Sequence, residues 1–234
     1  MTTLLALDSS THSCSVALTV DGQLFNRIVT EPREHARRLL PMVDEILVES
    51  GIQLADVDAL CFTHGPGSFT GLRIGFGVVQ GLAFGAGLPV IGVSTLEVLA
   101  RKAAALDGLT SGTVMPVLDA RMGEVYWGLY QIDGKDDCIA VITDKVCSPD
   151  AVAFGNNIPP NLLAGEGVSL LGEAFSGIDR DPTISPDAVY TLEAAKALYL
   201  RGGAHAVETV SLSYIRNEVT WKKHQKIRGP GKSD

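Results

Sequence analysis

The chain has 234 residues, of which 46% are hydrophobic and 20% are charged, and it carries a formal net charge of −8 at pH 7. This length and composition indicate a folded globular protein of one large domain or two modest ones, and they exclude a largely disordered chain. The negative charge argues against a general nucleic-acid binder, because neutralising phosphates requires clustered Lys and Arg side chains.

Four cysteines lie far apart and form no C-x-x-C pair: Cys14, Cys61, Cys138 and Cys147. This spacing predicts neither a zinc site nor a disulfide framework. The N-terminus shows no basic-then-apolar leader, so we expect a cytoplasmic protein.

The uncharged run from Ile74 to Val93 is interrupted at Gly87 and Pro89, which leaves about 17 helical residues, at the lower limit for a membrane span. No membrane contact is predicted.

The N-terminal stretch LLALDSSTHSCSVALTVDGQLF predicts three strands. Its first apolar run ends at Asp8, a small polar turn follows, and an alternating run leads to the hairpin signal Asp21-Gly22. A helix over 33–50 comes next, in which Pro41 predicts a kink or a late start and Gly51 predicts the end. Its apolar stripe consists of Leu39, Leu40, Val43, Ile46 and Leu47.

A buried strand over 59–65 leads into the loop THGPGSFTGLRIG, which opens a helix over 68–87. Glycines around a Ser/Thr pair before a helix are typical of a phosphate-binding loop. The same glycines also allow a sharp strand-to-helix turn, with Ser68 or Thr70 capping the helix. The sequence leaves both interpretations open.

Gly77, Gly81 and Gly85 recur every four residues in this helix and predict one face that another backbone can approach closely. Apolar residues cluster on the opposite side: Phe69, Leu72, Phe76, Val79 and Ala83. A helix that is apolar nearly all round is buried on both faces. Either the helix over 33–50 covers the second face, or a partner protein does. A strand over 88–94 and a helix over 95–106 complete this half.

The stretch VMPVLDARMGEVYWGLYQIDGK repeats the opening pattern, with Asp119 lying 111 residues after Asp8. It predicts a turn at Met122-Gly123 and a second hairpin signal at Asp133-Gly134. We therefore predict a duplication, with domains at 1–107 and 108–234 and a hinge over 106–111. A last helix is expected over 185–201.

From Arg216 to the C-terminus there are six basic residues against two acidic ones, a net charge of +4 in an otherwise acidic chain. Such a tail is most often a solvated terminus. Contact with RNA or an acidic partner is the alternative, in which Trp221 beside Lys222 and Lys223 stacks on a base or on a partner.

Two mixed α/β domains that each open with an Asp-bearing hairpin resemble the duplicated fold of actin, sugar kinases and Hsp70. In that fold the hairpin turns hold phosphates across a cleft, which makes Asp8, Ser9, Thr11 and Asp119 the candidate nucleotide-binding residues. The bulky Arg121-Met122 turn departs from the small turn that usually admits a phosphate. The alternative, which we favour from the sequence, is that Asp8 and Asp119 only cap tight turns.

Four stretches together resemble the TsaB (YeaZ) family of bacterial tRNA threonylcarbamoyladenosine biosynthesis: ALDSSTHSCSVAL, THGPGSFTGLRIG, PVLDARMGEVY and SYIRNEVTWKK. The resemblance spans essentially the whole chain. It implies a scaffold subunit that dimerises with a TsaD-type transferase, is joined by a TsaE-type ATPase, reaches tRNA indirectly, and self-associates when its partner is missing. It further implies that this chain binds no cofactor tightly and that ATP and magnesium act through the partners.

The resemblance also implies that the two N-terminal-domain helices form the partner interface. The candidate interface residues are Leu39, Met42, Val43, Ile46, Phe69, Leu72, Phe76, Val79, Gln80 and Ala83.

TsaD-type relatives bind a metal through two histidines in a pattern like N-H-x-x-G-H. Here the matching positions are Thr95 and Leu99, and a leucine cannot coordinate a metal. The five histidines show no pair at ligand spacing: His12, His35, His64, His205 and His224. His64 is expected to be a strand-end histidine bonded to backbone. We therefore predict no metal site and no catalysis by this chain alone.

Two other functions remain open. An independent ATP-dependent enzyme of the kinase type would use the cleft between Asp8 and Asp119. A peptidase is the weaker alternative, because the sequence contains neither H-E-x-x-H nor G-x-S-x-G.

Overall fold

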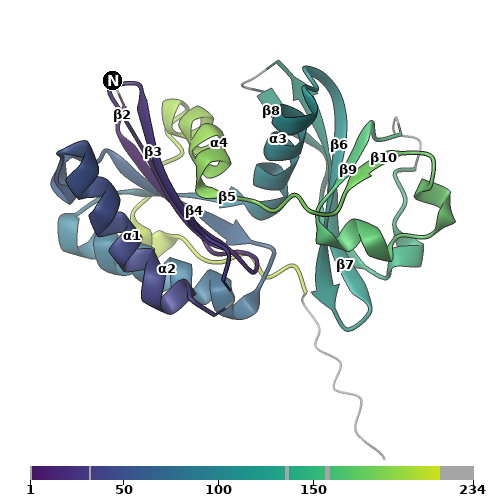
Figure 1. The fold of residues 1–234 in the computed structure, drawn as a ribbon, viewed down its shortest axis with the longest axis horizontal. Helices are drawn as coiled ribbons and strands as arrows, with labels where there is room; N and C mark the ends of the chain where they lie inside the picture. Colours follow the sequence, from purple (N-terminus) through teal and green to yellow (C-terminus); the bar gives the residue numbers. More distant parts are fainter. Residues whose placement is uncertain (1, 32, 135–136, 156–158, 217–234) are drawn as a thin grey trace, which may run out of the picture.

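The structure, a computed structural model, describes residues 2–31, 33–134, 137–155 and 159–216. They form two lobes, each built on a mixed five-stranded sheet (Figure 1). The first sheet has the order β3-β2-β1-β4-β5. Its strands are β1 (Leu4–Asp8), β2 (Cys14–Val20), β3 (Gln23–Val29), β4 (Ala59–Gly65) and β5 (Val90–Ser94).

The second sheet repeats this topology in the order β8-β7-β6-β9-β10. Its strands are β6 (Ser111–Arg121), β7 (Glu124–Asp133), β8 (Asp137–Cys147), β9 (Leu162–Ala164) and β10 (Asp179–Asp181). In both sheets the first three strands are antiparallel and the last two join in parallel. The predicted duplication and the actin, sugar kinase and Hsp70-type fold are confirmed.

Helices α1 (His35–Ser50) and α2 (Phe69–Ala86) cover one face of the first sheet. The predicted strand over 59–65 and the end of α1 at Gly51 are as expected, and α1 starts two residues later than predicted, with Pro41 inside it. Helix α2 is the one described helix that is long and apolar enough to cross a membrane by composition. Its inner face packs against the first sheet through Leu72, Val79 and Ala83.

The other two helices are exchanged between the lobes. Helix α3 (Thr95–Asp107) follows the first sheet in sequence, but its buried face packs on the second sheet. Helix α4 (Ala188–Leu200) follows the second sheet and covers the free face of the first. The two helices also pack against each other between the sheets (Figure 1).

This exchange corrects the predicted division at 107/108. The first lobe consists of residues up to Ser94 together with α4 and the segment up to about residue 215, and the second lobe consists of α3 and the chain up to β10. Assigning contiguous halves placed both helices with the wrong sheet. On its far face the second lobe has only short 3₁₀ turns in its described residues: Pro149–Ala151, Glu166–Leu170 and Glu173–Phe175.

Candidate functional site

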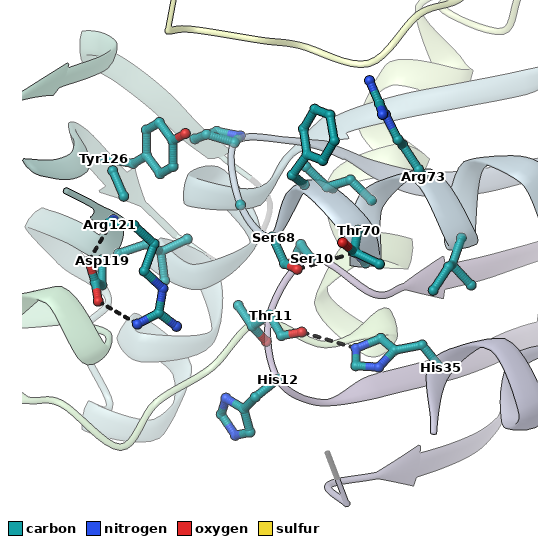
Figure 2. A pocket seen from close by; sticks show the side chains of 18 of the residues that line it. Ser10, Thr11, His12, His35, Ser68, Thr70, Arg73, Asp119, Arg121 and Tyr126 are labelled. Carbon is teal, nitrogen blue, oxygen red and sulfur yellow. Dashed lines mark hydrogen bonds and ion pairs between the residues drawn. The ribbon is translucent and has the colours of Figure 1, made fainter. Parts of the chain in front are cut away.

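A cavity of about 820 Å³ lies between the lobes. Its walls are the turn after β1, the loop and first turn of α2, the β6–β7 turn and the C-terminal segment. Figure 2 shows polar side chains from both lobes around it, among them Ser10, Thr11, Ser68, Asp119 and Arg121. This is the place where the two predicted hairpin turns face each other.

The turn after β1 is docked directly on the N-terminus of α2. The Ser68 amide donates to the carbonyl of Ser10 (2.7 Å), and the Ser9 hydroxyl donates to the carbonyl of Gly71 (2.9 Å). A Cβ on Gly71 would collide with the Ser9 carbonyl, and one on Gly75 would collide with the Ser9 hydroxyl. The glycine loop therefore makes room for the chain's own hairpin turn, and Ser68 caps α2 as predicted.

The Asp8 side chain stabilises this turn and does not line the cavity. The carboxylate is fully buried, and its Oδ1 accepts from the Thr63 hydroxyl (2.6 Å), the Ser10 hydroxyl (2.7 Å) and the Ser10 amide (3.3 Å). Its Oδ2 has no hydrogen-bond partner in the described part of the chain. Burial raises the pKa of Asp8, and this outweighs the lowering by its hydrogen bonds.

The predicted nucleotide-binding set is thus corrected in part. Asp8 and Ser9 do not line the cavity, because Asp8 is hydrogen-bonded to β4 and Ser9 to α2. Thr11 and Asp119 do line the cavity.

Asp119 caps the second hairpin turn. Its Oδ1 accepts from the Arg121 amide (2.7 Å) and its Oδ2 accepts from the Arg121 guanidinium (2.9 Å). Arg121 and Met122 both have positive φ angles, of 63° and 57°. Both carboxylate oxygens are therefore engaged within the turn, in agreement with the structural alternative for this aspartate.

The four histidines in the described part of the chain lie in no cluster of metal-ligating side chains. The described residues contain no group of three or more His, Cys, Asp or Glu side chains that could hold a metal ion. His35 places its Nε2 3.0 Å from the Thr11 carbonyl and 3.1 Å from the Ser13 carbonyl, which ties α1 to the first turn. Thr95 and Leu99, at the positions of the family's metal ligands, are both completely buried.

His64 lies at the end of β4, as predicted. Its Nδ1 is buried without a hydrogen-bond partner among the described residues. Burial lowers the pKa of this imidazole, against the opposing effect of Asp144.

Beside His64 lies a polar cluster that sequence analysis missed. The Ser94 hydroxyl caps α3 and donates to Asp144 on β8 (2.6 Å), and the Tyr130 hydroxyl donates to the other oxygen of the same carboxylate. Burial raises the pKa of Asp144. Ser94 and Asp144 lie 50 residues apart and come from different sheets, so no local pattern indicates the contact.

The predicted partner interface is largely wrong in its residues. Seven of the ten side chains are buried beneath α1 and α2: Leu39, Met42, Val43, Ile46, Leu72, Val79 and Ala83. The apolar stripe of each helix covers its own sheet, which is the commonest use of such a stripe. Phe76 is half-buried and stacks on Phe62, while Phe69 and Gln80 are exposed.

The glycine row lies on the outer face of α2. Gly77, Gly81 and Gly85 are exposed, and a Cβ on any of them would meet nothing within 4 Å. Helix α1 therefore leaves this row uncovered. Large apolar side chains are exposed on the same two helices, with Phe84 70% exposed on α2 and Val48 82% exposed on α1.

The contrast between Gly71 and Gly77 gives a test of the docked turn. We expect Gly71→Ala to lower the free energy of unfolding by about 1–3 kcal/mol, because the new methyl group strikes the Ser9 backbone. Gly77→Ala, in the same helix, is the matched control and should raise it by about 0.5–1 kcal/mol, since alanine is the better helix former. Urea unfolding followed by circular dichroism measures both. Equal effects would contradict the assigned role of Gly71.

The buried carboxyl gives a pH-dependent test. The folded chain holds the Asp8 proton more tightly than the unfolded chain, so this group's contribution to the free energy of unfolding falls as the pH rises above about 4. Asp8→Asn keeps an acceptor for Thr63 and Ser10 but does not titrate. We expect its stability relative to the parent chain to increase from about pH 4 towards neutrality.

Urea titrations at several pH values, with Asp119→Asn as the control, measure this difference. A constant difference in the free energy of unfolding between Asp8→Asn and the parent chain over that pH range would show that the carboxyl does not titrate as described.

Comparison with known proteins agrees with this architecture. Residues 28–215 match the family model described as TsaD: tRNA N6-adenosine threonylcarbamoyltransferase. The chain is 42% identical over 230 residues to the tRNA threonylcarbamoyladenosine biosynthesis protein TsaB of Escherichia coli, covering 94% of this chain and 97% of that protein. It is 39% identical over 236 residues to the TsaB protein of Haemophilus influenzae, covering 94% and 96%.

Solved structures give the same result. YeaZ from Pseudomonas aeruginosa is 40% identical, with a TM-score of 0.85, and the match covers 92% of this chain and 100% of that one. A second structure, of an uncharacterized protein with similarity to peptidase YEAZ from the same organism, has a TM-score of 0.84 at 39% identity, with the same coverage of both chains.

Proposed function

The chain belongs to the TsaB (YeaZ) family, and we propose that it acts in tRNA threonylcarbamoyladenosine biosynthesis as a non-catalytic docking subunit. The relatives that cover nearly the whole chain are named for that pathway. A TsaD-type transferase is the proposed main partner, a TsaE-type ATPase joins the pair, and tRNA is reached through the assembly. Because tRNA is the substrate of that pathway, we propose a cytoplasmic location for the protein.

We propose the docking role because one apolar helix, α2, is largely uncovered by the rest of the chain. Only 28% of the 18 residues of α2 are buried, although the helix has the composition of a membrane span. Its outer face combines three glycines with the exposed ring of Phe84. A row of glycines lets a second helix approach closely, and an apolar face of this kind favours a protein partner.

The partner surface that we propose is therefore the outer face of α1 and α2, and it replaces most of the residues predicted from the sequence. It consists of Leu40, Val48, Gly77, Gln80, Gly81, Phe84 and Gly85. The same surface on two copies of the chain would give a two-fold symmetric homodimer when the transferase is missing.

The non-catalytic role rests on the cavity. Asp8 is sealed beneath the first turn, both oxygens of Asp119 are held by Arg121, and the Ser68 amide at the start of α2 is bonded to Ser10. The Asp8 carboxyl is thus buried away from the cavity, and the Asp119 carboxylate and the Ser68 amide are bonded within the chain. We propose that the chain holds no cofactor tightly and that ATP and magnesium act at the partner subunits.

Docking is tested by Gly81→Arg, which places a charged side chain in the middle of the glycine row. We expect light scattering to show loss of the homodimer, and affinity for a TsaD-type partner to fall by at least about tenfold, a cost of about 1.4 kcal/mol. Ile139→Arg, on the exposed edge strand β8 of the other lobe, is the control. If both variants bind like the parent chain, the α1–α2 face is not the docking surface.

Separate assays test whether the chain alone is catalytic and whether it binds ATP. The pure chain should transfer no threonylcarbamoyl group to tRNA, and titration calorimetry should show no binding at millimolar ATP. Micromolar ATP binding that is lost in Asp119→Asn would favour the kinase-like alternative, and transfer by the pure chain would overturn the non-catalytic role.

A further inference from the structure

The C-terminal segment crosses the mouth of the interlobe cavity. Ser213, Tyr214 and Arg216 all line that cavity. The Ser213 amide donates to the carbonyl of His64 at the end of β4 (2.8 Å). At Gly65, which has a φ of 118°, a Cβ would lie 2.7 Å from the Ser213 carbonyl oxygen. The strand end is therefore shaped to seat this segment.

Tyr214 anchors the segment to the first lobe. The Arg73 Nε donates to the Tyr214 hydroxyl (3.1 Å), and the Arg73 guanidinium lies 3.6 Å from the centre of the Phe69 ring and 5.8 Å from that of Tyr214. The arginine thus stacks against two aromatic rings, an arrangement that is favourable for a delocalised cation. This contact fixes the segment on the first turns of α2.

Arg216 anchors the segment to the second lobe, two residues later. Its Nη2 donates to the carbonyls of Ala120 (3.2 Å) and Arg121 (3.4 Å) and to the carboxylate of Glu124. These acceptors belong to the β6–β7 turn, and the Arg216 side chain is 20% exposed. A planar guanidinium matches several acceptors at once, whereas a lysine ammonium does not.

We propose that Ser213–Arg216 is a strap that ties the two lobes together across the cavity mouth, and that its release lets the lobes move apart. The chain also passes between the lobes at Ser94–Thr95 and between β10 and α4, on the side where α3 and α4 pack together. In Figure 1 the strap (yellow) passes on the opposite side, towards the lower end of β7. The strap therefore limits the opening that those two connections allow.

The strap also accounts for the start of the stretch SYIRNEVTWKK, which the sequence analysis connected only with the family resemblance. Tyr214 and Arg216 have internal partners in both lobes. Trp221, Lys222, Lys223 and the rest of the basic tail lie outside the described residues.

The experiment uses the full chain with spin labels on genetically encoded keto amino acids at Ala36 on α1 and Glu173 in the second lobe, both exposed. Electron–electron resonance measures the distance between the lobes, and hydrogen exchange measures protection of the Ser213 amide. We expect Arg216→Met to broaden and lengthen the distance distribution and to speed exchange at Ser213 by about tenfold. Arg201→Met, an exposed arginine near the end of α4, should change neither.

Faster exchange at Ser213 with an unchanged distance distribution would overturn the proposal, because the segment would then lie on the lobes without tying them. No change in either measurement would overturn it as well. Exchange of the β1 amides reports whether the whole fold has been weakened. If Arg216→Met has weakened the whole fold, Tyr214→Leu is used instead, because it releases the other anchor. The proposal then requires that Tyr214→Leu widen the distance distribution while the β1 amides stay protected from exchange.

Discussion

The contact between the turn after β1 and the first turn of α2 organises much of the molecule. Two glycines, Gly71 and Gly75, bring the Ser9 backbone and hydroxyl against the helix, at a distance that no side chain would allow. The amide of Ser68, which a bound anion would otherwise attract, bonds to Ser10. This contact closes one wall of the cavity, buries Asp8, and sets the direction in which α2 leaves the sheet. The position of the outer face of α2, on which the proposed partner surface lies, follows from this contact.

The two lobes share one topology but differ in what they present to solvent. The first has two long helices over its outer face, of which α2 is apolar well beyond the needs of its own core. The second has short 3₁₀ turns at the corresponding place in its described residues. The two halves are therefore asymmetric, because only the first has long helices over its outer face. The proposed docking surface lies on these helices.

Local patterns predicted most of the elements. Alternating apolar residues and the signals Asp21-Gly22 and Asp133-Gly134 gave the strands of both hairpins, and the repeat of Asp8 at Asp119 gave the duplication. The exchange of α3 and α4 could not be predicted, because either helix has a buried face that fits either sheet. Most of the predicted interface residues are buried for a related reason: an apolar stripe on α1 indicates the side that faces the core. The proposed partner surface is on the other side of the helix. The cluster of Ser94, Tyr130 and Asp144 depends on contacts between sheets, which no window of sequence contains.

The exchanged helices have a consequence for synthesis on the ribosome. The first sheet is complete once Ser94 has emerged, yet the face that holds Leu4, Ala6 and Ile91 is covered by α4, whose first residue is Ala188. At about 5–20 residues per second, that face waits on the order of 5–20 seconds for its cover. During this time the nascent chain displays an apolar sheet surface that invites chaperones or aggregation. A chain that terminated early, after α3, would keep that surface bare permanently, so partial products of this protein are natural substrates for quality control.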